Sequence, residues 1–260
     1  MEHLLKKLAL PRIRLIYRDW IDRAGKEGMS YSDFLRGLLE EEVCAREESR
    51  LRNLMKKANF PFEKTLEQFD FRVHPELRHQ VFQNYLEESF VREGRALVLI
   101  GAPGLGKTHI SVAIGIKMVQ RRFDVRFITV QRLVNQVLSA ETAKEKNRIL
   151  RTYRNCPLLI LDEFGYLLPD SETGPVLYEL IAERYEKRAT IITSNKSLTE
   201  WGKIIQDNSL ASALIDRLMH HGDVYYLKGE SYRMKGKERI LEQQSKQQQK
   251  SASEEGKVNG

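Results

Sequence analysis

The chain has 260 residues, of which 43 are Lys or Arg and 36 are Asp or Glu, giving a formal net charge of +7. This length allows one or two domains with a sizeable core. No apolar run approaches the roughly 18 residues that a membrane helix needs, and Arg12 and Arg14 interrupt the apolar start of the chain. We therefore expect a cytoplasmic protein with no membrane partner and no secretory signal. The positive charge suits a polyanionic partner such as nucleic acid, although charge alone does not establish one.

The two cysteines, Cys44 and Cys156, match no metal-ligand spacing. A cytoplasmic chain favours two reduced thiols, although a disulfide between them stays open at this point.

The first 58 residues are rich in charge and in helix formers and show no strand-like alternation. Four apolar residues have the i, i+3, i+4, i+8 spacing of one helix face: Leu35, Leu38, Leu39 and Val43. Ser32 is a candidate N-cap for this helix. We expect the helix to end near Asn59, because Pro61 disfavours helical structure in the residue before it.

After the first 70 residues, predicted strands and helices alternate. Strands are predicted at 97–100, 125–130, 158–161 and 189–193. Helices are predicted at 75–91, 131–153, 175–187 and within 198–220, of which 131–153 contains one or two helices. A further helix is predicted directly after the first strand and the loop that follows it. Strands separated by helices imply crossover connections and a parallel sheet covered on both faces, which is an α/β fold.

These patterns divide the chain into three predicted parts. An N-terminal all-α domain covers residues 1–62, and an α/β domain covers residues 63–240. The polar, low-complexity residues 241–260 are predicted to be a disordered tail. We expect the first domain to contact DNA or a protein partner.

A nucleotide-binding motif follows the first predicted strand. It reads Gly101, Ala102, Pro103, Gly104, Leu105, Gly106, Lys107 and Thr108, which fits the P-loop pattern G-x-x-x-x-G-K-[ST]. Backbone N–H groups of such a loop surround phosphate oxygens, Lys107 can reach the β- and γ-phosphates, and the Thr108 hydroxyl can hold Mg²⁺. A glycine-rich turn without a ligand is the alternative, but the position between a strand and a helix favours a nucleoside triphosphate site.

Polar residues follow two later strands. Asp162 and Glu163 come directly after the apolar run 158–161, where ligands of open α/β sheets bind. Asp162 can hold Mg²⁺ together with Thr108, and Glu163 can act as general base on a water near the γ-phosphate. Asn195 ends the next strand and can orient that water. Each also has a simpler interpretation, as an acidic pair that ends a strand or as a turn-forming Ser-Asn sequence.

Basic residues between the second and third predicted strands form a candidate DNA surface. They are Arg132, Lys144, Lys146 and Arg148, followed by Arg151 and Arg154. Helices that carry such side chains can contact DNA phosphates, and a solvated helix face is the alternative. A second candidate surface is the basic N-terminal segment Lys6, Lys7, Arg12, Arg14 and Arg18. We expect binding to duplex DNA that is mostly independent of sequence.

Several motifs in this order resemble the AAA+ ATPases of the initiator and helicase-loader group, and among them the IstB-type helper ATPases of bacterial insertion sequences, which are relatives of the DnaC loader. The similar segments are residues 59–71, GAPGLGKTH, LLILDEFGYL, TIITSNKSLTEW, SALIDRLMHHG and GESYR, and they span roughly residues 1–240. The resemblance implies that the α/β domain is a P-loop AAA+ ATPase domain.

The resemblance also implies a role for individual residues. The loop from Gly101 to His109 is Walker A, and Asp162 with Glu163 is Walker B. Asn195 matches sensor 1, Arg217 the arginine finger that enters a neighbouring subunit's site, and Arg233 sensor 2. The segment 59–71 matches a linker near the adenine.

By the same resemblance, the expected function is ATP-dependent self-assembly on duplex DNA, with Mg²⁺ as the metal. The assembly would recruit or activate a transposase encoded by the same element, and the DNA-bound protein would be associated with the bacterial nucleoid. A DnaC-like replicative helicase loader is the alternative with the same core. A small-molecule P-loop kinase is a third hypothesis, but it gives no role to Arg217.

Overall fold

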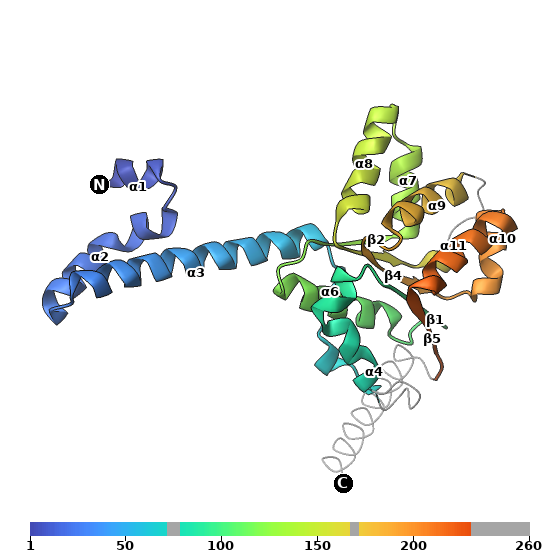
Figure 1. The fold of residues 1–260 in the computed structure, drawn as a ribbon, viewed down its shortest axis with the longest axis horizontal. Coiled ribbons are helices and arrows are strands. Elements are labelled where there is room, and N and C mark those ends of the chain that lie inside the picture. The colour runs from blue at the N-terminus through green and yellow to red at the C-terminus, as the bar shows by residue number, and fades with distance from the viewer. Residues whose placement is uncertain (72–78, 167–171, 230–260) are drawn as a thin grey trace, which may run out of the picture. The chain divides into compact units, whose positions relative to one another are not determined.

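The computed structural model describes residues 1–71, 79–166 and 172–229 (Figure 1). Contacts divide the chain into two compact units, Met1–Lys56 and a second unit that begins at Lys57. The domain limits predicted from the sequence, with a boundary at 62/63, remain a prediction, and the predicted tail 241–260 lies outside the described residues. Within those described ranges, we find no helix with the length and apolar character to cross a lipid bilayer.

The first unit is helical, as predicted. Its helices are α1 (Glu2–Lys7), α2 (Pro11–Glu27) and α3 (Tyr31–Ala58), the last of which continues past the unit's end. Pro11 begins α2, where its missing N–H costs nothing, and Gly28 ends α2 in the left-handed conformation. A small core contains Leu5, Ile13 and Leu38.

One detail of α3, its N-cap, differs from the sequence prediction. Ser30, and not Ser32, caps the helix, because the Asp33 N–H donates to the Ser30 hydroxyl oxygen at 3.1 Å. Of the four apolar residues predicted to share one face, Leu38 is buried, whereas Leu35, Leu39 and Val43 are exposed. Both cysteines are free thiols, so the disulfide that the sequence left open is not formed.

The second unit contains a five-stranded sheet in its described residues, with strand order β2-β3-β4-β1-β5. The strands are β1 (Ala96–Gly101), β2 (Val125–Thr129), β3 (Leu158–Asp162), β4 (Ala189–Ser194) and β5 (Gly222–Leu227). All neighbouring pairs are parallel, which confirms the predicted parallel sheet. The sequence did not predict β5, because this edge strand is half-buried and lacks the continuous apolar run of β3.

Helices surround this sheet. The longer ones are α6 (Lys107–Gln120), α7 (Val130–Leu138), α8 (Ala143–Asn155), α9 (Thr173–Arg184) and α11 (Asn208–His220). Shorter ones are η1 (Leu66–Gln68), α4 (His79–Gln83), η3 (Asn84–Leu86), α5 (Glu88–Arg92), η4 (Phe164–Tyr166), η5 (Leu198–Glu200) and α10 (Trp201–Ile205). The stretch predicted as helical over 75–91 is mostly helical in its described part, but a 3-10 turn divides it into α4 and α5.

The two faces of the sheet are covered by different helices. The helix α6 contacts β1 to β4, whereas α7 packs on β2 and α11 on β1 (Figure 1). Alternate strand residues follow this division: Val98, Leu159 and Ile192 belong to the core cluster that includes α7, α9 and α11. Because the strands are parallel, the carboxyl ends of β1, β3 and β4 meet at one edge, and the predicted polar residues follow these ends.

Candidate functional site

The phosphate loop connects β1 to α6. Gly104 and Gly106 have φ angles of 84° and 85°, in the left-handed region that glycine adopts without strain. The Lys107 ammonium donates to the carbonyl oxygens of Gly101 at 2.6 Å and Ala102 at 2.8 Å, so its side chain lies along the loop. The loop thus places a cation and the N-terminal turn of a 14-residue helix at one point, an arrangement that suits a phosphate group.

A hydrogen-bonded chain connects the loop with β3 and β4. The Thr108 hydroxyl oxygen lies 3.0 and 3.1 Å from the two carboxylate oxygens of Asp162. The Thr193 hydroxyl donates to Asp162 and accepts the Glu163 N–H at 3.0 Å. Thr108, Asp162 and Glu163, predicted from separate motifs, therefore lie together, and Thr193 bridges the Asp162 carboxylate and the Glu163 backbone N–H.

Asp162 is buried, with 4% of its surface exposed. Burial raises the pKa of its carboxyl above the ordinary value, although hydrogen bonds from Thr193 and Thr108 and the charge of Lys107 act in the opposite direction. Positive charge placed next to this carboxylate would offset the cost of its burial.

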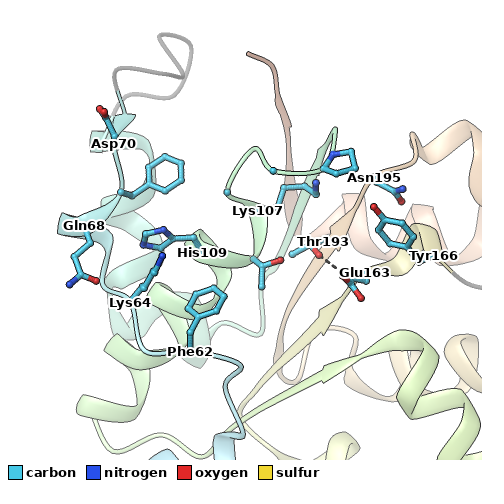
Figure 2. Close-up of a pocket in the computed structure, with 15 residues that line it drawn as sticks. Phe62, Lys64, Gln68, Asp70, Lys107, His109, Glu163, Tyr166, Thr193 and Asn195 are labelled. Carbon is cyan, nitrogen blue, oxygen red and sulfur yellow. Dashed lines mark hydrogen bonds between the residues drawn. The ribbon is translucent and has the colours of Figure 1, made fainter. Parts of the chain in front are cut away.

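Glu163 and Asn195 line the same cleft as the phosphate loop (Figure 2). Glu163 is exposed and has a φ angle of 62°, an uncommon conformation for a residue with a side chain. The Asn195 Oδ1 atom is buried and has no hydrogen-bond partner among the described residues. A Cβ atom at Gly165 would lie 1.8 Å from this oxygen, so only glycine leaves room for the Asn195 amide.

Aromatic rings from the segment before the sheet form the other wall of this cleft of about 470 Å³. His109 lies edge-on to Phe69 and Phe62, with ring centroids 5.3 and 6.3 Å apart, and its Nε2–H donates to the Thr65 carbonyl at 2.8 Å. Burial, with the nearby charge of Lys64, lowers the pKa of His109 below its ordinary value. The predicted linker near the adenine therefore lies beside the phosphate loop.

Sequence reasoning missed two residues of this cleft. Thr193 and Tyr166 both line the cleft, and no local motif predicts a role for either. A hydroxyl at the end of β4 becomes informative once β4 is known to be next to β3, and the sequence does not give strand order directly.

The site fits ATP and Mg²⁺ by its donor groups. The Thr108 hydroxyl and the Asp162 carboxylate supply the hard oxygen ligands that Mg²⁺ prefers, and they already lie within hydrogen-bond distance of each other. The Asn195 side chain lines the same cleft, with its Oδ1 atom buried against Gly165.

Arg217 lies elsewhere in the fold. On α11, its guanidinium carbon is 4.8 Å from the centre of the Tyr178 ring, and its Nη1 donates to the Ala213 carbonyl at 3.0 Å. It lines a separate hollow together with Ala96 and Thr190. These two residues lie at the amino ends of β1 and β4. Arg217 is therefore not brought together with the residues of the nucleotide cleft in one chain. Arg233 lies outside the described residues.

The predicted DNA contacts lie on α7 and α8. Arg132, Lys144 and Arg148 are exposed and Lys146 is half-buried. Arg154, by contrast, forms ion pairs with Glu179 and Glu183 of α9, so the expectation that it contacts phosphates is not supported. The remaining side chains leave a basic surface on these two helices.

Comparisons with known proteins agree with this arrangement. The family model of IstB-like ATP binding proteins matches residues 3–240. The insertion sequence IS5376 ATP-binding protein of Geobacillus stearothermophilus is 37% identical over 242 residues, which cover 93% of this chain and 96% of the relative. The insertion sequence IS21 ATP-binding protein of Pseudomonas aeruginosa is 35% identical and covers 91% of this chain and 89% of its own length.

A solved structure has the same fold. AMPPCP-bound DnaA from Aquifex aeolicus has a TM-score of 0.56 and 20% sequence identity, covering 71% of this chain and 56% of DnaA. This similarity shows that the two proteins share a fold, the parallel sheet flanked by helices that the sequence predicts. The chain belongs to the family of IstB-like ATP-binding proteins.

Proposed function

We propose that this protein is an ATPase that binds Mg²⁺-ATP, assembles with further copies of itself on duplex DNA, and recruits or activates a transposase encoded by the same insertion sequence. The observation that supports this proposal most directly is the hydrogen-bonded chain from Thr108 through Asp162 and Thr193 to Glu163. A phosphate loop alone would serve any nucleotide-binding protein, whereas these hydrogen bonds connect the loop to the Asp162 carboxylate and to the backbone N–H of Glu163.

Binding begins with the phosphate loop. Lys107 would exchange the Gly101 and Ala102 carbonyls for β- and γ-phosphate oxygens, which are stronger partners because they are charged. The N–H groups of the loop and of the first turn of α6 would surround the same phosphates. The wall of Phe62, Phe69 and His109 offers an aromatic surface for the adenine.

Hydrolysis then needs an activated water molecule. Glu163 would accept a proton from this water while the water oxygen bonds to the γ-phosphorus and the bond to the β–γ bridging oxygen breaks, releasing ADP and phosphate. The Asn195 side chain, which lines the same cleft, would hydrogen-bond this water and hold it in line. Bound Mg²⁺ would neutralise the charge that develops on the phosphate oxygens.

Assembly would complete the site. Because Arg217 lies away from the cleft of its own chain, it would act on the nucleotide of a neighbouring copy, as an arginine finger does in trans. Hydrolysis would then depend on assembly, which makes ATP a switch for the assembled state. Arg132, Lys144 and Arg148 would contact phosphates of DNA without reading bases.

ATPase measurements with and without duplex DNA test this proposal. The rate per chain should rise with protein concentration and should rise further with duplex DNA of unrelated sequences. A rate that is independent of both, or phosphoryl transfer to a small metabolite, would contradict it.

A replicative helicase loader would share the ATPase core, so partner capture separates the two functions. The full chain with an ATP analogue should retain the transposase of its element from a mixture that also contains the replicative helicase. Retention of the helicase alone would identify a loader.

A further inference from the structure

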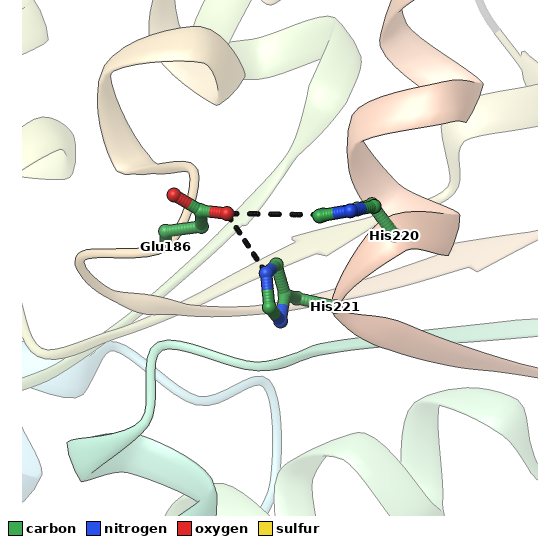
Figure 3. Close-up of side chains that lie close together, drawn as sticks. All are labelled: Glu186, His220 and His221. Atoms are coloured by element: carbon green, nitrogen blue, oxygen red, sulfur yellow. Dashed lines mark hydrogen bonds and ion pairs between the residues drawn. The ribbon is translucent and has the colours of Figure 1, made fainter.

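Three potential metal ligands meet on the surface at the end of α11. They are His220, the last residue of α11, His221, which follows it, and Glu186, which follows α9 (Figure 3). One ligand atom from each lies within 4.8 Å of the others. All three are exposed, so a cation from solution can reach them.

The distances suit one shared cation. The Glu186 Oε1 atom lies 2.8 Å from His221 Nε2 and 3.7 Å from His220 Nδ1. In a tetrahedral site with metal–ligand bonds of 2.0–2.1 Å, two ligand atoms are about 3.3 Å apart. This separation lies between the two distances from Glu186 Oε1. A hydrogen bond accounts for the shorter contact, but the 3.7 Å contact is too long for one. The two imidazole rings, with centroids 4.5 Å apart and planes at 87°, approach the carboxylate from different directions.

The backbone holds these ligands in place. Glu186 has a φ angle of 57°, and its turn packs so closely on Gly94 that a Cβ there would lie 2.9 Å from the Glu186 carbonyl carbon. His221 immediately precedes β5, which pairs with β1 along its whole length. The cluster therefore depends on the fold and not on flexible surface side chains alone.

A fourth ligand has room beside the histidines. His220 and His221 also line an open hollow of about 570 Å³ together with Glu93, Arg95, Gly222 and Asp223. Asp223 already accepts hydrogen bonds from Tyr85 and Arg95, so we do not count it as a ligand. The open hollow offers space for a water molecule at the fourth position.

We propose that Glu186, His220 and His221 bind one Zn²⁺ ion, with water as the fourth ligand. Two imidazole nitrogens and a carboxylate oxygen are ligands typical of zinc, whereas Mg²⁺ prefers oxygen alone. This site is separate from the nucleotide cleft, and binding at it requires no nucleotide.

Tyr185 competes with the metal for one ligand. Its hydroxyl oxygen lies 2.5 Å from His220 Nδ1, within hydrogen-bond distance, and its ring packs against both histidines. Zn²⁺ binding displaces this hydroxyl. Tyr185→Phe keeps the ring and removes the competitor, so this variant binds Zn²⁺ at least as tightly as the parent.

Calorimetric titration of the full chain with Zn²⁺ alone, without nucleotide, tests the proposal. A Cys44→Ser parent removes the exposed thiol as another zinc ligand. This parent should bind one Zn²⁺ per chain, and Glu186→Gln, His220→Gln and His221→Gln should each weaken binding about 10-fold or more. His3→Gln, a histidine change outside the cluster, is the matched control and should bind like the parent.

Substitution of Co²⁺ for Zn²⁺ adds a spectroscopic measure of the ligands. The parent should show the visible absorption of four-coordinate Co²⁺, and His221→Gln should lose it. The proposal is overturned if the parent binds no single equivalent, if the three cluster variants bind like His3→Gln, or if Tyr185→Phe loses binding.

Discussion

The Thr108 hydroxyl oxygen lies 3.0 Å from one carboxylate oxygen of Asp162 and 3.1 Å from the other, across 54 positions of sequence. This contact joins the first turn of α6 to the end of β3. It depends on the sheet order, because β3 and the phosphate loop on β1 lie on either side of β4. The fold itself thus brings the two proposed Mg²⁺ ligands together.

Replacing Asp162 by Asn should stabilise the nucleotide-free protein and weaken its Mg²⁺-dependent ATP binding. Burial raises the pKa of Asp162, so the ionised carboxylate at neutral pH costs folding free energy that an amide does not. A gain of about 1 kcal/mol would raise the Tm by about 2–4 °C. Thermal unfolding with a chelator present measures this difference.

The pH dependence of that gain has a definite sign. Because the folded-state pKa lies above the unfolded one, the gain is full above the folded pKa and shrinks as the pH falls through it. The stability gain should vanish below the ordinary Asp pKa of about 3.9, where Asp162 is protonated in both the folded and the unfolded state. A variant that is less stable than the parent at every pH would contradict this account of Asp162.

Lys107→Ala should lose most of its ATP affinity. A hydrogen bond to a charged group contributes about 1.5–3 kcal/mol, which corresponds to roughly 10- to 100-fold weaker binding. Fluorescent-nucleotide titration measures the affinity. Lys117→Ala, an exposed lysine on the same helix, is the matched control and should bind normally. Equal losses in both variants would show an effect of charge on α6 and not of a phosphate contact.

Glu163→Gln should bind ATP and assemble but hydrolyse slowly. The amide keeps the shape of the side chain but cannot accept the proton of the attacking water, and a general base contributes about 10²–10⁴-fold to the rate. Single-turnover hydrolysis, measured beside nucleotide affinity, separates the two effects. Glu88→Gln, on the surface of α5, should leave both unchanged. Turnover of Glu163→Gln at the parent rate would assign the base to another residue.

Gly115→Ala should destabilise the packing of the linker on α6. A Cβ atom there would lie 2.8 Å from Phe60 Cε1 and 2.9 Å from Ile160 Cδ1, and such overpacking costs about 1–3 kcal/mol. Gly25→Ala in α2 is the opposite control, since a Cβ there meets nothing within 4 Å. It should stabilise its helix by up to about 1 kcal/mol. Urea unfolding measures the free energy of unfolding of each variant. A change of the same sign in both variants would contradict this interpretation.

Local sequence patterns predicted much of this fold. The continuous apolar runs of β1 and β3 identify buried parallel strands, because both faces of these strands are covered. The half-buried edge strand β5 has no such run, and its place depends on pairing with β1. The interruption between α4 and α5 and the Ser30 cap are local details that apolar spacing does not resolve.

In the candidate site, too, some features follow from local sequence patterns and others only from the arrangement of the fold in space. Lys107, Thr108, Asp162 and Glu163 were predicted from local motifs, and the structure places them together. The bridge through Thr193 requires the order of strands in space. The distance of Arg217 from the cleft requires the whole fold, and its proposed partner is another copy of the chain.

Mixing two inactive variants tests the shared site most directly. Glu163→Gln keeps Arg217, and Arg217→Ala keeps Glu163, so each lacks a different half of the proposed site. Each alone, with duplex DNA, should bind ATP and hydrolyse it poorly, and a mixture of the two should regain hydrolysis, because Arg217 of one copy meets Glu163 of the next. A mixture no more active than the two variants measured separately would contradict an ATP site completed between subunits.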